Sequence, residues 1–299
     1  MKKQLIIPIL TVILTACSGV KNLRVPETDI PVTFSIYMSN DTACLADLKW
    51  WEFYSDPALS GLIRKTLEQN KDLLTAASKI EELRLIYGAD KAALLPSLSL
   101  NAYANNETNN YSGSGTINDT EIGMKVTVGW EANLAGALSW AKKRSASNYK
   151  ASVEDYRAMQ MALIALTAEG YYQMAALENE IQIVERTVET RMESLRMAKI
   201  RFEGGLTPET VYQQAIVEYT SAASKLPDLK RRLNATRNAL TILMGETPKD
   251  TFDLEISRLA PVDVSKLPVG IPSGLVERRP DIRASRLRLD AARANVGYN

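Results

Sequence analysis

The chain has 299 residues, of which 45% are hydrophobic, and its 36 basic and 35 acidic side chains nearly cancel. This balance offers no basic stripe of the kind that nucleic-acid binding requires, so no nucleic-acid partner is expected. The chain has no histidine and only two cysteines, so it lacks the commonest general base and metal ligand. The sequence therefore predicts no enzyme, no metal site and no bound cofactor.

Residues 1–16 have the pattern of a signal peptide, because Lys2 and Lys3 precede an apolar run too short to span a membrane. The run leads to "LTAC", which ends at Cys17 and resembles the bacterial lipobox. In lipobox proteins this cysteine carries acyl chains after cleavage, and several chains anchor a protein stably. Ser18 resembles the residue found in lipoproteins sorted to the outer membrane. The alternative is an ordinary signal peptide with a chance cysteine.

An irregular segment with two prolines covers residues 17–56, and a helical pattern follows it. Asp56 and Pro57 suit the N-cap and the first position of a helix. Apolar residues at steps of three and four predict one helix over about 57–94. Pro96 ends this pattern.

The period then changes to two in "EIGMKVTVGWE", which alternates strictly over about eleven residues, the length of a tilted membrane strand. A weaker alternation over 97–104 and a polar Asn/Gly/Ser loop complete a predicted hairpin at about 97–131. The expected membrane-facing residues are Ile122, Met124, Val126, Val128 and Trp130. A half-buried sheet of a soluble protein is the alternative; the lipoprotein signal favours the membrane. Open strand edges in lipid leave backbone groups unsatisfied, so the hairpin needs further strands from this chain or from other copies.

Heptad-like apolar spacing predicts a very long helix from about 145 to 203, roughly 90 Å in length. The stretch "EGGLTP" interrupts it, since Gly204 and Gly205 suit a left-handed C-cap and Thr207 suits an N-cap. A second heptad run follows, so 145–244 reads as a long helical hairpin. Pro227 should bend its second arm.

An internal repeat aligns Lys71–Ala89 with Pro280–Tyr298, and both copies open a predicted helix after a linker with proline. Three identities and four conservative matches support the alignment. The domains expected from it are a first repeat at 57–244, a linker at 245–271 and the start of a second repeat at 272–299. We therefore expect the chain to be an N-terminal fragment of a longer protein.

These segments together resemble the TolC-like outer-membrane efflux factors, specifically their lipoprotein branch of the OprM/NodT type. The resembling stretches are "LTAC", "WWEFYSDPALSGLI", "LLPSLSL", "VTVGWEANL", "RFEGGLTPETV", "LTILMGE" and "ERRPDIRASRLRLDAARANVG". The resemblance implies a mainly α fold with a membrane β-hairpin, in which each protomer of a homotrimer adds strands to one β-barrel and helices to a coiled-coil tunnel. It also implies a passive exit duct of a tripartite efflux system, driven by an inner-membrane pump through a periplasmic adaptor.

The resemblance also carries roles to individual residues. Cys17 matches the acylated cysteine, so its covalent lipid would be the only attached group, and the protein would sit in the outer membrane of a Gram-negative bacterium and extend into the periplasm. Gly204, Gly205, Leu206 and Thr207 match the tip where adaptors dock, although a plain helical turn also explains them. Trp130 matches an interfacial anchor, although packing explains it equally well. The alternative function is a lipid-anchored periplasmic coiled-coil scaffold or adaptor without a pore.

Overall fold

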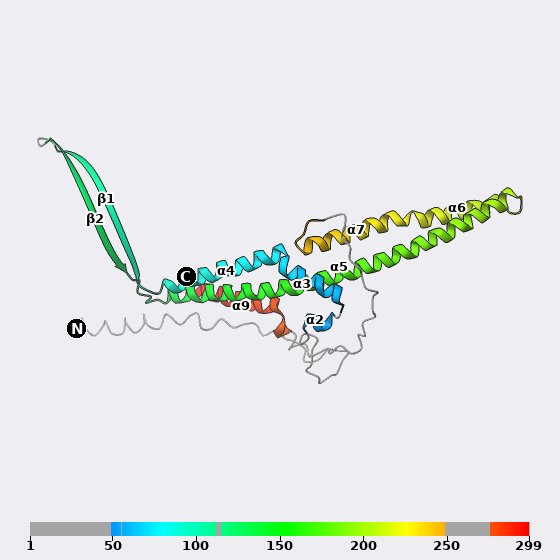
Figure 1. The fold of residues 1–299 in the computed structure, drawn as a ribbon. Coiled ribbons are helices and arrows are strands. Elements are labelled where there is room, and N and C mark those ends of the chain that lie inside the picture. Colours follow the sequence, from blue (N-terminus) through cyan, green and yellow to red (C-terminus); the bar gives the residue numbers. More distant parts are fainter. Residues whose placement is uncertain (1–48, 55, 112–114, 249–275, 299) are drawn as a thin grey trace, which may run out of the picture. The chain divides into compact units, whose positions relative to one another are not determined.

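The computed structural model describes residues 49–54, 56–111, 115–248 and 276–298, which form helices and one two-stranded sheet (Figure 1). Cys17 and the predicted signal peptide lie outside the described residues. The elements in chain order are α2 (Trp50–Phe53), α3 (Pro57–Gln69), α4 (Lys71–Ala92), β1 (Ser97–Tyr111), β2 (Gly115–Gly129), α5 (Ala137–Glu203), α6 (Glu209–Ala223), α7 (Lys225–Leu243) and α9 (Pro280–Tyr298). Among these described segments, no helix is both long and apolar enough to cross a membrane.

The chain divides into two compact units. The first contains the hairpin and its flanking helical stretches, residues 78–154, together with α9. The second contains α2, α3, the start of α4, the part of α5 from 155 onward, α6 and α7. The predicted division into a first repeat, a linker and a second repeat stays a prediction, although α9 and α4 begin at the two aligned residues, Pro280 and Lys71.

The single helix predicted over about 57–94 is wrong in one respect, because it breaks into α3 and α4 at Asn70. The Asn70 backbone is extended, with φ −60° and ψ 127°. Its side-chain Oδ1 accepts the Leu73 N–H at 3.0 Å and so caps α4, while its Nδ2 donates to the Leu243 carbonyl at 2.9 Å. The break therefore ties the start of α4 to the end of α7.

Replacing Asn70 with alanine should lower the free energy of unfolding by about 2 kcal/mol, since it removes a helix cap and a hydrogen bond that each contribute about 1 kcal/mol. Urea unfolding followed by far-UV circular dichroism measures the change. Asn234→Ala is the matched control: Asn234 is exposed on α7, and alanine is the better helix former there. Equal losses in the two variants would contradict the role given to Asn70.

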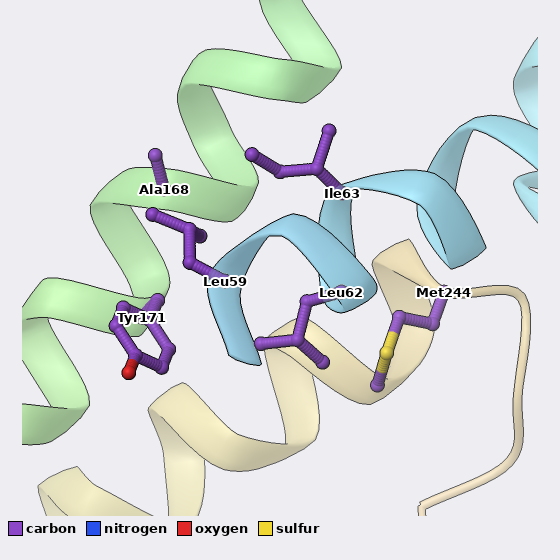
Figure 2. Packing of buried hydrophobic residues seen from close by; sticks show 6 residues of the cluster. All are labelled: Leu59, Leu62, Ile63, Ala168, Tyr171 and Met244. Atoms are coloured by element: carbon purple, nitrogen blue, oxygen red, sulfur yellow. The ribbon is translucent and has the colours of Figure 1, made fainter. Parts of the chain in front are cut away.

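The core of the second unit forms where α3 crosses α5 and the end of α7 (Figure 2). Its fully or nearly buried residues are Leu59, Leu62, Ile63, Ala168, Tyr171 and Met244. The predicted N-cap at Asp56 is confirmed, because its Oδ1 accepts the Ala58 N–H at 2.9 Å. Its Oδ2 also accepts the Tyr171 hydroxyl at 2.7 Å, which connects the start of α3 to α5.

Helix α5 begins at Ala137, about eight residues before the predicted start. The reason is local: Asn133 Oδ1 accepts the Leu138 N–H at 3.0 Å, and Gly136 takes a positive φ of 78°, so the chain turns directly from the hairpin into the helix. The second arm is interrupted at Ser224 between α6 and α7. Pro227 lies three residues later and has no N–H to donate to the Ala223 carbonyl. This missing helical hydrogen bond is the reason for the predicted bend.

The two arms of the helical hairpin pack along the predicted apolar seam. Leu177 and Ile181 of α5 are buried against Leu229 of α7. The apolar heptad positions of α5 run from Met174 to Phe202 and are interrupted by Arg191, which forms an ion pair with Glu218 of α6. The polar interruption of the seam is thus matched by a carboxylate on the opposite arm.

Candidate membrane hairpin and helical tip

Strands β1 and β2 pair antiparallel in a single register from Ser97 opposite Gly129 to Tyr111 opposite Gly115. Residues directly opposite in such a pair share one face of the sheet. One face is apolar through four successive pairs: Leu98 with Val128, Leu100 with Val126, Ala102 with Met124, and Ala104 with Ile122. The four predicted residues of β2 are between 63% and 80% exposed, so no described part of the chain covers this face.

The opposite face of the hairpin is polar. It carries Ser99 with Thr127 and Asn101 with Lys125. Tyr103 donates its hydroxyl to Glu121 Oε1 at 3.0 Å, and its ring lies against Gly123, where a Cβ would come within 2.4 Å of the ring. The glycine therefore makes room for the Tyr103 ring, and beside the apolar pairs the opposite face is polar.

The apolar face is shorter than the strands. It ends at Ala104 and Ile122, and the next four pairs are polar on both faces: Asn105, Asn106, Glu107, Thr108, Asn118, Asp119, Thr120 and Glu121. Six residue steps from Leu98 to Ala104 cover roughly 20 Å along the strand, which is shorter than the roughly 25 Å height of the apolar band on transmembrane barrels. The outer halves of both strands extend past that band.

Trp130 is placed differently from the prediction. It follows the last paired residue of β2, Gly129, and is therefore not a strand residue. Pro96 precedes β1 and has no N–H, so the ladder cannot extend to meet it. The Trp130 indole instead donates to the Leu94 carbonyl at 3.3 Å, and its ring stays 65% exposed at the base of the hairpin.

The tip between α5 and α6 has one left-handed residue rather than two. Gly205 takes φ 71°, whereas Gly204 continues the helix by donating to the Ile200 carbonyl at 3.0 Å. The N–H of Gly205 reaches Phe202 and that of Leu206 reaches Arg201, which together form a Schellman C-cap. This cap leaves the Leu206 side chain 78% exposed.

The predicted N-cap role of Thr207 is wrong. Helix α6 begins at Glu209 with Pro208 as its N-cap, so Pro208 precedes the first helical position. Thr207 Oγ1 is buried and makes no hydrogen bond within the described part of the chain. The extended backbone of Pro208, with ψ 154°, moves the start of the helix one residue beyond the expected point.

Charged residues near the tip form solvated ion pairs. Arg196 hydrogen-bonds both oxygens of Glu193 at 2.8 and 2.6 Å, and this contact holds the pKa of the Glu193 carboxyl below its usual value. Exposed pairs of this kind add little stability. Within the described ranges, no group of three or more histidine, cysteine, aspartate or glutamate side chains is arranged to hold a metal ion. The first unit therefore offers an apolar strand face, and the second offers a helical turn with an exposed leucine.

Comparisons with known proteins agree with this geometry. A family model described as "Outer membrane efflux protein" matches residues 62–246. The probable efflux pump outer membrane protein TtgC of Pseudomonas putida is 29% identical over 99% of the chain and 63% of its own length. The solvent efflux pump outer membrane protein SrpC of Pseudomonas putida is 32% identical over 82% of the chain and 53% of its own length.

Solved structures show the same fold. The outer-membrane channel OprN superposes with a TM-score of 0.78 at 24% identity, over 92% of this chain and 62% of that one. The chain thus spans less than two thirds of the length of these relatives. The predicted fold class, mainly helical with a β-hairpin of the outer-membrane efflux type, is confirmed. By the matched stretch and the shared fold, the chain belongs to the outer membrane efflux protein family.

Proposed function

We propose that the chain belongs to the outer-membrane channel of a tripartite efflux system, a passive exit duct for small molecules. An inner-membrane pump would drive transport and a periplasmic adaptor would connect the two. Two features of one chain carry this proposal. One is a hairpin with an apolar and a polar face, whose apolar band is roughly 20 Å long, and the other is a 67-residue helix. The family supports it, since its relatives are named as efflux pump outer membrane proteins.

The hairpin supplies the membrane contact in this proposal. Its apolar face meets the acyl chains of the outer membrane and its polar face meets water. Neither outer edge of the two-stranded sheet has a partner strand within the described residues, and unpaired backbone groups in lipid are costly. We therefore include homotrimerisation in the proposal, together with lipid attachment at Cys17 as a further anchor.

A scaffold without a pore is the competing function. Such a protein has no need for a lipid-facing row on a hairpin, whereas this chain carries four successive apolar pairs on one exposed face. The apolar face therefore favours the channel.

The tip residues Gly204, Gly205, Leu206 and Thr207 are proposed to dock the adaptor. Leu206 is the most exposed apolar side chain of the tip, and a groove beside it runs between α5 and α6 past Met197 and Val211. The groove is lined by both apolar and charged side chains, among them Arg201 and Glu218, and an exposed leucine beside it suits the packing of a partner's helical hairpin.

Leu206→Asp should weaken adaptor binding by roughly tenfold or more, because it places a charge where a buried apolar contact is expected. Surface plasmon resonance with an immobilised periplasmic adaptor of the same bacterium measures this. Val217→Asp is the control, since Val217 is also exposed but lies further along α6. Unchanged binding by the Leu206 variant would remove the tip from the proposal.

Export itself is tested in cells whose copy of the gene is disrupted. Such cells should accumulate more of a fluorescent efflux dye than wild-type cells, and the restored gene should lower accumulation again. The same cells show whether the protein fractionates with the outer membrane. Equal dye accumulation with and without the gene would argue against the exit-duct function and return the scaffold to first place.

A further inference from the structure

Basic side chains gather where the hairpin joins the helices. Tyr87 of α4 stacks on Tyr149 of α5 with ring centroids 6.5 Å apart, which fixes these two helices side by side. Lys91 lies one turn beyond Tyr87, and Lys142 and Lys143 lie about two turns before Tyr149. Since α4 runs toward the hairpin and α5 runs away from it, all three lysines lie on the hairpin side of the tyrosine pair.

These three lysines have no anionic partner among the residues that the structure describes. None of them forms an ion pair with another described residue, and the Lys143 ammonium lies 4.3 Å from the centroid of the Trp140 ring. Arg144 differs, because it donates to Asn295 Oδ1 at 2.8 Å and its guanidinium lies over the Tyr298 ring. Arg144 thus holds α9 to α5, whereas the lysines keep their charges available.

Exposed apolar side chains lie between the lysines and the strands. Trp130 and Leu95 line one hollow at the base of the hairpin, and Leu134 in the following turn is 94% exposed. Tryptophan with one apolar and one polar side prefers the boundary between lipid and water. From the strands toward the helices, the exposed side chains therefore change from aliphatic to aromatic, with Glu131 beside Trp130, and then to basic.

One leaflet of a phospholipid bilayer changes in the same order, from acyl chains through the interface to phosphates. We infer that Lys91, Lys142 and Lys143 bind the phosphates of anionic phospholipid headgroups at the border of the apolar face that is nearest the helices. Basic side chains next to a membrane segment are attracted by anionic lipids, and an ammonium pairs with phosphate as a point charge. This inference rests on the proposed membrane insertion and adds the class of lipid.

The test uses the whole chain and two kinds of vesicle, one of phosphatidylcholine alone and one with a quarter of its lipid replaced by phosphatidylglycerol. The wild type should bind both and prefer the anionic vesicles. Changing the three lysines to glutamine (K91Q, K142Q and K143Q together) should reduce binding to anionic vesicles by roughly tenfold or more and leave binding to phosphatidylcholine unchanged. The matched control makes the same charge change elsewhere, at the exposed residues Lys71, Lys199 and Lys225.

The outcomes separate the two proposals. If the wild type binds neither vesicle, membrane insertion and with it the proposed function fail. If it binds both and the triple glutamine variant keeps the anionic preference, or the control loses it equally, insertion stands and the lipid-binding role of Lys91, Lys142 and Lys143 is overturned. Half-molar salt should remove the anionic preference of the wild type, since it shortens the range of surface charge interactions.

Discussion

Gly245→Ala is expected to lower the free energy of unfolding by about 3 kcal/mol, one of the largest effects of any single added methyl group in this chain. Gly245 follows α7 and takes φ 73°, where an L side chain is strained. A Cβ there would also lie 2.2 Å from the Gln69 carbonyl oxygen, which is backbone and cannot rotate away. The displacement would reach the neighbouring Asn70 and its bond to Leu243. Urea unfolding followed by circular dichroism measures the loss.

Gly205→Ala provides the matched control for this substitution. Gly205 has nearly the same dihedral angle, φ 71°, but nothing lies within 4 Å of the position its Cβ would take. It should therefore lose only the left-handed strain, about 1 kcal/mol. If both variants lose the same amount, the close approach of Gly245 to Gln69 does not matter for stability.

Val126→Arg is expected to reduce strongly the fraction of protein molecules whose hairpin inserts into lipid. Val126 pairs with Leu100 near the middle of the apolar face and is 63% exposed. Arginine on the lipid face at mid-depth costs about 2–4 kcal/mol, which is enough to shift a marginal insertion equilibrium strongly. The measurement is the fraction of protein that resists carbonate extraction from membranes.

Thr127→Arg places the same side chain one residue further on, where it faces Ser99 on the polar side. That face already carries Lys125, so the expected loss of insertion is small. The comparison tests the assignment of faces rather than the tolerance of the strand for arginine. Equal losses would mean that the hairpin does not sit with one face in lipid.

The alternation of residues 121–131 was enough to predict four of the five residues expected on the apolar face, because a period of two leaves no choice once the strand exists. It could not show that the strand ends before Trp130. The long helical hairpin was also readable, since a heptad pattern sustained over many turns has one common interpretation. The seam residues Leu177, Ile181 and Leu229 are buried as that pattern requires.

Features set by single contacts, rather than by a periodic pattern, could not be read in the same way. The break at Asn70 is fixed by a hydrogen bond to the Leu243 carbonyl, 173 positions away. The local sequence indicates it only through the tendency of asparagine to cap helices. The early start of α5 depends on the hydrogen bond that the Asn133 side chain accepts from the Leu138 N–H, five residues further along the chain. Thr207 was a plausible cap by residue type, but Pro208 took that position in the fold.

The polar outer half of the hairpin has a consequence for how the protein enters a membrane. In the orientation that the resemblance implies, the helices extend into the periplasm, so Glu107, Asp119 and Glu121 must cross the hydrocarbon layer once. Each carboxylate at the bilayer centre costs about 3 kcal/mol or more, so unassisted crossing is slow. The same barrier opposes withdrawal of the hairpin from the membrane. Once inserted, the hairpin would therefore be kinetically trapped across the bilayer.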